Sequence, residues 1–459
     1  MTSKNPADER LRGLLGGLSP AARALISKAV KARPGAAPPA SPEAPPAAAP
    51  VSSTTIDERR QALGRAFFEP IVPFINASKL LHRETGRLSE DTVAVIWEWI
   101  ARDLAKDAVA AVVYDPRADF STAARPLRET VLPALSAVIA GVGDTQLAEQ
   151  RLAAQIGGDR GHRDLAAIEQ AFREIAWVAP VMKTLPRMLT RRDFEDDIGL
   201  LAPLEAALMS PRGDPAWLFS ALLPHLESPT LLARIAVILS GVDAADAIER
   251  SPVAPALDIL LSEIEIEVAR LRDARAERRA GGAGIAAAEL AIQRYHSMLR
   301  EVEVIVDLGA ASRWANRIAL LKKVATAEVA PEVAETGGLT RRVFRLKGAK
   351  GEPQPIDAEL VEDADRALRF LKAAANARES FALNAVLASV SREVEQTFEM
   401  MVEPLLQQLR NTYGDAKARV AARAEAVLRL AETYFGPAYA ATLRRSVALA
   451  GEERSRLRG

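Results

Sequence analysis

The segment that most constrains the fold is residues 255–335, in which a group of glycines separates two apolar stripes. In each stripe apolar residues recur every three or four positions, the spacing that lines one face of a helix. The stripes are Leu257, Leu261, Ile264, Val268 and Leu271, and then Ile292, Tyr295, Leu299, Val302 and Val306. Gly281, Gly282 and Gly284 lie between them, and glycine weakens a helix interior but suits a helix end. We therefore predict an antiparallel helical hairpin.

One part of the first stripe also fits a different structure. From Glu263 to Val268 acidic and apolar residues alternate, a period of two that is typical of a strand. Helical spacing continues on both sides of this window, from Leu260 through Leu271. Because the longer pattern outweighs a six-residue window, the sequence favours a helix here.

The composition favours helices throughout the chain. Aromatic residues make up 5% of the sequence and hydrophobic residues 49%, so the apolar content comes mainly from Ala, Leu and Val. The predicted fold class is all-α: an irregular multi-helix body, made of a solenoid-like stack plus a long-helix bundle, behind a disordered Pro/Ala-rich N-terminal linker. The predicted domains are an N-terminal arm (1–33), the linker (34–55), a domain of short bent helices (56–254), the hairpin (255–335), a basic non-helical loop (336–356) and a long-helix bundle (357–459).

The N-terminal arm is predicted to bind a partner. Its apolar face is formed by Leu11, Leu14, Leu15 and Leu18. All but three of residues 34–50 are proline or alanine, a composition that forms a semi-rigid spacer with nothing to bury. The arm is therefore tethered, and a basic amphipathic segment of this kind docks in a protein groove or on a membrane surface. The alternative is a short helix that packs on its own domain or frays in solution.

Two local features lie within the predicted domains: a series of prolines and a basic segment. The many prolines of residues 126–251 are expected at first turns of helices, which would give short, bent helices. In the basic loop Phe344 and Leu346 alternate with basic residues, which predicts a short strand and turn. The candidate site for a phosphate or an acidic partner consists of Arg341, Arg342, Arg345, Lys347 and Lys350. The alternative is a solvated basic loop.

No catalytic, cofactor or metal signature is present in the sequence. Cysteine is absent, which excludes disulfides, thiolate nucleophiles and Cys-ligated metals. The four histidines, His82, His162, His225 and His296, are far apart, and none has a carboxylate or histidine three or four residues later. Residues 157–162 are glycine-rich but lack the Gly-Lys-Ser/Thr of a phosphate loop. We expect no cofactor and no metal, and we single out His296 because it follows Tyr295 on the hairpin.

The predicted function is that of a non-enzymatic helical scaffold or adaptor, which binds partner proteins, or copies of itself, through helix surfaces and the tethered arm. Two alternatives stay open: an all-α enzyme with an unrecognised site, and nucleic-acid or phosphate binding through residues 341–350. Lys plus Arg equals Asp plus Glu at 60 each, which argues against a general nucleic-acid or membrane binder. No apolar run reaches the roughly 18 residues of a membrane span, and no signal-peptide core follows the charged N-terminus. A cytoplasmic protein is expected.

Overall fold

The structure is a computed structural model. It describes residues 53–76, 86–142, 146–157, 161–196, 198–210, 212–279, 284–309, 312–345 and 353–452. The predicted arm, with its four leucines, and most of the predicted linker lie outside the described residues. The description below concerns the unit Thr54–Gly459, since nearly all of the other unit, Met1–Ser53, lies outside the described residues.

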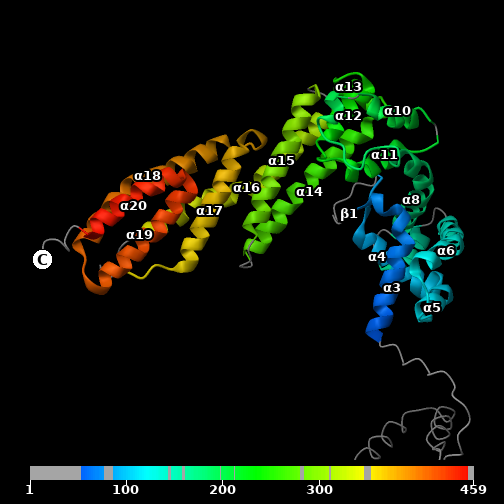
Figure 1. The fold of residues 1–459 in the computed structure, drawn as a ribbon, viewed down its shortest axis with the longest axis horizontal. Helices are drawn as coiled ribbons and strands as arrows, with labels where there is room; N and C mark the ends of the chain where they lie inside the picture. Colours follow the sequence, from blue (N-terminus) through cyan, green and yellow to red (C-terminus); the bar gives the residue numbers. More distant parts are fainter. Residues whose placement is uncertain are drawn as a thin grey trace, which may run out of the picture. The chain divides into compact units, whose positions relative to one another are not determined.

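The all-α fold class is confirmed (Figure 1). Among the described residues the strands are β1 (Ile75–Asn76) and β2 (Leu88–Ser89), which pair in parallel with Ile75 beside Leu88. The N-terminal helices and 3₁₀ or π segments are α3 (Ser53–Phe68), η1 (Glu69–Phe74), α4 (Glu90–Trp99), η3 (Ile100–Leu104), α5 (Lys106–Tyr114), α6 (Phe120–Val142), α7 (Gln146–Ile156), α8 (Gly161–Met182), α9 (Asp193–Asp196), η4 (Ile198–Leu201), α10 (Ala202–Leu208), α11 (Pro215–Leu222), η5 (Leu223–His225), α12 (Leu231–Ser240) and α13 (Ala245–Glu249). The remaining elements are α14 (Ala254–Arg279), α15 (Ile285–Ile305), α16 (Arg313–Phe344), α17 (Ala358–Asn376), η6 (Arg378–Ser380), α18 (Asn384–Asn411), α19 (Gly414–Phe435) and α20 (Pro437–Glu452).

The first helices pack around tryptophan side chains. Ser89 caps α4, and its side chain accepts a hydrogen bond from the Thr92 backbone N–H at 3.0 Å. Trp97 and Trp99 of this helix are both 4% exposed, so both belong to the core. A Cβ on Gly64 of α3 would lie 2.6 Å from the Trp97 indole nitrogen, so glycine lets the two helices approach closely.

The prediction that prolines would break this region into short helices throughout is wrong for its two longest helices. Pro203 and Pro215 do occupy first turns, in α10 and α11. However, Pro126 and Pro133 lie inside the 23-residue α6, and Pro180 lies inside the 22-residue α8. Interior proline removes one hydrogen bond and introduces a clash, at a cost of about 3 kcal/mol. Burial of long apolar faces on α6 and α8 offsets that local cost.

The two predicted apolar stripes lie on α14 and α15, which pack side by side (Figure 1). The connection between them ends at Gly284, where a Cβ would lie 2.5 Å from the Ala274 carbonyl oxygen. The alternating window from Glu263 to Val268 is helical, as the longer pattern favours. Ile264, in the middle of that window, is 0% exposed, because α14 is contacted by α11, α12, α15 and α16.

The predicted non-helical loop at residues 336–356 is wrong for its first nine residues. Helix α16 runs from Arg313 to Phe344, so the predicted strand pattern at Phe344 is the last turn of a helix. Gly337 lies inside α16 where a Cβ would overlap the Glu393 carboxyl group of α18. Phe344 is buried and packs edge-on against Phe398 of α18, with the ring centroids 5.0 Å apart. Glycine is therefore needed at this position for close packing on α18. The local sequence suggests a loop only when that packing is not considered.

Helices α17 to α20 complete the described C-terminal part and pack on α16 and on one another (Figure 1). Asp357 caps α17 through its side chain, which accepts a hydrogen bond from the Glu359 N–H at 3.0 Å. In the part of the chain that the structure describes, every helix is too short or too polar to cross a lipid bilayer.

Deletion of residues 1–50 is expected to leave the thermal midpoint within a few degrees of the full-length value. The first described helix begins at Ser53, and the spacer composition offers no apolar surface to bury. The change would be measured by circular dichroism at matched protein concentration. A decrease of more than about 8 °C would mean that the removed segment contributes several kcal/mol to the fold, and would contradict this expectation.

Candidate functional site

Four helices meet at the centre of the described chain. Helix α14 contacts α15 and α16, and α17 contacts the same two helices. The four therefore contact one another in the cyclic order α14, α15, α17, α16. Two hollows open on neighbouring faces of α14, and Ala274 lines both of them.

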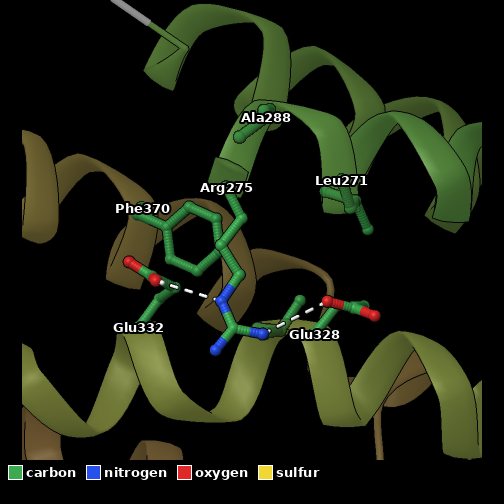
Figure 2. Close-up of a pocket in the computed structure, with 8 residues that line it drawn as sticks. Leu271, Arg275, Ala288, Glu328, Glu332 and Phe370 are labelled. Atoms are coloured by element: carbon green, nitrogen blue, oxygen red, sulfur yellow. Dashed lines mark hydrogen bonds and ion pairs between the residues drawn. The ribbon is translucent and has the colours of Figure 1, made fainter. Parts of the chain in front are cut away.

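The first hollow is a small cavity between the four helices (Figure 2). Every one of the four helices contributes to its lining. The lining residues are Leu271, Ala274, Arg275, Ala288, Glu328, Val329, Glu332 and Phe370. Its volume is about 10 Å³, which is the room needed for about one water molecule. The cavity is therefore too small for a substrate or a cofactor.

Arg275 crosses this cavity and joins α14 to α16 (Figure 2). Its Nη1 donates to Glu328 Oε2 at 3.2 Å, and its Nε lies 3.4 Å from Glu332 Oε1. Glu328 also accepts a hydrogen bond from Arg272 Nε at 3.0 Å. The side chain of Glu332 is 4% exposed and that of Arg275 is 21% exposed. Buried pairs of this kind fix which helix faces meet, so we assign the cluster a structural role.

The second hollow, here called the hairpin groove, is an open depression of about 270 Å³ between α14 and α15. It is lined by α14 residues Glu267, Arg270, Asp273, Ala274 and Glu277, and by α15 residues Ala287, Leu290, Ala291 and Arg294. Ala274 and Ala291 are buried and form its apolar part. Leu290 is 46% exposed beside them. Apolar and charged groups are therefore both accessible in the hairpin groove.

Glu267 is the unusual residue of the hairpin groove. It is 4% exposed, and its Oε1 accepts a hydrogen bond from Arg270 Nη1 at 2.5 Å, with Arg294 Nη1 at 3.8 Å. Its Oε2 is buried and has no hydrogen-bond donor among the described residues. Burial raises the pKa of the Glu267 carboxyl, although Arg270 and Arg294 act in the opposite direction. An ionised carboxylate only accepts hydrogen bonds, so this oxygen lacks a donor.

His296, which the sequence singled out, is paired with a serine. Its Nδ1 lies 2.7 Å from Ser380 Oγ, and the Tyr295 hydroxyl donates to the Ser380 carbonyl oxygen at 2.9 Å. A serine next to a histidine is the arrangement of an activated nucleophile. Here, however, Ser380 is 0% exposed and lines neither of the two hollows, so no opening beside α14 leads a substrate to its hydroxyl. Burial, followed by the charge of Arg300, lowers the pKa of His296, and the neutral ring serves to hold η6 on α15.

The predicted basic site comprises Arg341, Arg342, Arg345, Lys347 and Lys350, of which the two lysines lie outside the described residues. The three arginines lie at the C-terminal end of α16, where cations interact favourably with the helix dipole. Arg341 Nη2 forms an ion pair with Glu393 of α18 at 2.7 Å. The positions of the described arginines are therefore explained by the helix end and by the ion pair with Glu393. This explanation does not require that they bind one common ligand.

The remaining sequence candidates do not come together. His225 Nδ1 lies 3.1 Å from the Pro186 carbonyl oxygen, while His82 and the side chain of His162 lie outside the described residues. Within the described ranges no three His, Cys, Asp or Glu side chains are placed to hold a metal ion. The sequence reasoning missed the hairpin groove. The sequence shows small residues here, Ala286, Ala287, Ala288 and Ala291, but no pattern in it assigns them to a groove.

Comparison with known proteins assigns no relative to this chain. No family model matches it. No curated protein is significantly similar to it. No solved structure matches it significantly either.

Proposed function

We propose that the protein is a non-enzymatic helical scaffold or adaptor, which binds partner proteins through helix surfaces and a tethered N-terminal arm. The observation that supports this proposal is the hairpin groove. It combines buried alanines, the exposed Leu290 and charged residues at its edge, the mixture of an apolar centre and a polar rim that is typical of protein interfaces. The hairpin itself is held rigidly from behind by α16 and α17. A rigid helix pair with one open seam is suited to receive a third helix.

The sizes of the two hollows favour protein binding over catalysis. The cavity of about 10 Å³ is too small to admit a substrate. The hairpin groove, of about 270 Å³, is an open depression at the lower edge of the roughly 300–1,000 Å³ typical of small-molecule sites, which are clefts that bury most of their ligand. A hollow of that size suits a side chain that a macromolecular partner inserts. The buried Ser380 and the ion-paired Arg341 give no support to the enzymatic and phosphate-binding alternatives.

The arm is expected to contribute the recruitment anchors. Replacing Leu14, Leu15 and Leu18 together by serine should abolish co-purification of arm-dependent partners, because buried apolar anchors are worth about 1–3 kcal/mol each. The measurement is affinity purification from the native cell, quantified by mass spectrometry, with the wild type, the 1–50 deletion and the triple variant. The circular dichroism of the three proteins should agree in the helical signal of the described chain.

A matched control reverses Lys28, Lys31 and Arg33 to glutamate. If the arm binds a protein groove through its leucines, the charge reversal should weaken binding less than the triple serine variant does. If the arm binds an anionic membrane, the charge reversal should weaken binding more. If the wild type enriches no protein above a bead-only background, the scaffold proposal fails. If the triple serine variant retains every partner, the arm is not the recruiting element.

A further inference from the structure

We propose that the hairpin groove receives a lysine or arginine side chain carried by a helix of a partner protein, and that the cationic group donates a hydrogen bond to Glu267 Oε2. This inference rests on the proposed scaffold function and names the chemistry of the partner. It is carried by three observations: the buried acceptor, the charge of the lining and the shape of the seam.

The buried acceptor determines that the guest is a hydrogen-bond donor. Glu267 is 4% exposed, and its Oε2 is buried without a donor among the described residues. A buried polar group without a partner costs about 1–3 kcal/mol, and more when it is charged. A donor that enters the groove would remove this cost. Arg270 and Arg294 lie beside Oε1, which leaves Oε2 as the oxygen to be satisfied.

The charge of the lining determines that the donor is cationic. The groove contains three acids, Glu267, Asp273 and Glu277, and two bases, Arg270 and Arg294, so its net charge is 2 − 3 = −1. Asp273 and Glu277 are exposed, so they can attract a cation before contact. A lysine or arginine head group provides the donors and the opposite charge together, and charge-assisted hydrogen bonds are roughly twice as strong as neutral ones.

The shape of the seam determines that the cation comes on a helix. The depression between α14 and α15 extends over more than one helical turn, because the side chains there are small: Ala274, Ala287 and Ala291. Small residues at a helix seam let the ridge of a third helix settle between the first two. Leu290, 46% exposed at the same place, offers an apolar contact beside the cation. A free small amine would leave this leucine uncovered.

The test uses defined peptides with the full-length protein. The probe is a fluorescent, stapled helical peptide with an Ala/Leu face and one central arginine. The matched peptide carries citrulline, which has nearly the same shape but no charge. Fluorescence anisotropy should show the arginine peptide binding at least tenfold more tightly than the citrulline peptide. In Glu267→Gln the two affinities should converge. In Glu399→Gln, an exposed acid on α18, the difference should persist.

A second variant tests the location independently of charge. Ala287→Trp fills the exposed side of the groove, so it should abolish binding of the arginine peptide while α15 stays folded. Retained binding in Ala287→Trp, or an unchanged preference for arginine in Glu267→Gln, overturns the inference. Equal affinity of N-acetyl-arginine amide and the helical peptide also overturns it, because the guest would then be a small cation. If neither peptide binds, this partner chemistry is wrong, whereas the scaffold proposal is judged separately by the purification experiment.

The folding control has a definite sign. A carboxyl whose pKa is raised in the folded state destabilises the fold at every pH at which it is ionised, so stability falls as the pH rises from its ordinary pKa of 4.5 through the raised value. Gln at position 267 does not ionise. Glu267→Gln should therefore melt no lower than the wild type at pH 7, and the difference between them should shrink below pH 4.5. Loss of peptide binding in this variant is then not a result of unfolding.

Discussion

Replacing Ile264 by aspartate is expected to prevent the protein from reaching a stable fold, or to lower its free energy of unfolding by on the order of 4–5 kcal/mol. Ile264 is 0% exposed in the middle of α14. Helix α14 packs against α11, α12, α15 and α16. An ionised carboxylate placed here loses its hydration and gains no cation. Urea denaturation followed by circular dichroism, together with the soluble yield, measures the effect.

The matched control is Val304→Asp on α15, the other helix of the hairpin. Val304 is also β-branched but is 69% exposed, so its charge stays hydrated. We expect a change within about 0.5 kcal/mol there. Wild-type solubility and melting in Ile264→Asp would mean that the first apolar stripe faces solvent, and the packing of α14 described above would be wrong.

Helix α14 also shows why the sequence pattern was ambiguous. Helix α14 packs against α11, α12, α15 and α16, and Ile264, Ile266 and Val268 are all buried, so its apolar residues are not confined to one stripe. Each of the intervening acids is paired with at least one cation from outside α14, and Glu267 also pairs with Arg270 of α14 itself. These pairs are Glu263 with Arg87, Glu265 with Arg317, and Glu267 with Arg270 and Arg294. A helix that is surrounded in this way loses its simple period, and only its length identifies it.

The error at residues 336–344 has a different origin. Gly337 and Gly338 have low helix propensity, which indicates a break when only local preferences are considered. The reason for Gly337 is the carboxyl group of Glu393, which lies far away in the sequence and next to it in space. A contact between distant helices cannot be derived from propensity. Within the predicted hairpin of residues 255–335, the two helices that carry the stripes were predictable, because the stripes and the glycines between them are local features, whereas residues 313–335 belong to α16.

The hairpin groove could not be predicted from the sequence, because it too depends on a contact between residues of different helices. Its acids and small residues are visible in the sequence, but Glu267 on α14 and Arg294 on α15 meet only because of the register between the two helices. A shift of one turn would place a different side chain beside the buried carboxylate. The periodicity defines which faces meet but not this register. The importance of Glu267 therefore appears only in the structure.

The second large effect is expected at Arg275, where the register of α14 and α16 is held. Replacing Arg275 by alanine should cost about 3–5 kcal/mol, the usual effect of removing one partner from a buried ion pair. Glu332, 4% exposed, would lose the guanidinium that lies 3.4 Å away, and the cavity of about 10 Å³ would grow by the volume of the missing side chain. The measurement is the free energy of unfolding from urea denaturation at pH 7.

Two comparisons separate the charge from the packing. Arg272→Ala removes a cation from the same carboxylate, Glu328, but the Arg272 side chain is 59% exposed, so its loss should cost no more than about 1 kcal/mol. The double variant Arg275→Met with Glu332→Gln removes both charges and keeps most of the volume. Because replacing both members of a buried pair is often neutral, it should recover most of the stability lost in Arg275→Ala. Equal losses in Arg275→Ala and Arg272→Ala would show that burial of the pair contributes nothing, and that the other contacts between α14 and α16, among them the ion pair of Arg317 with Glu265, hold the two helices together.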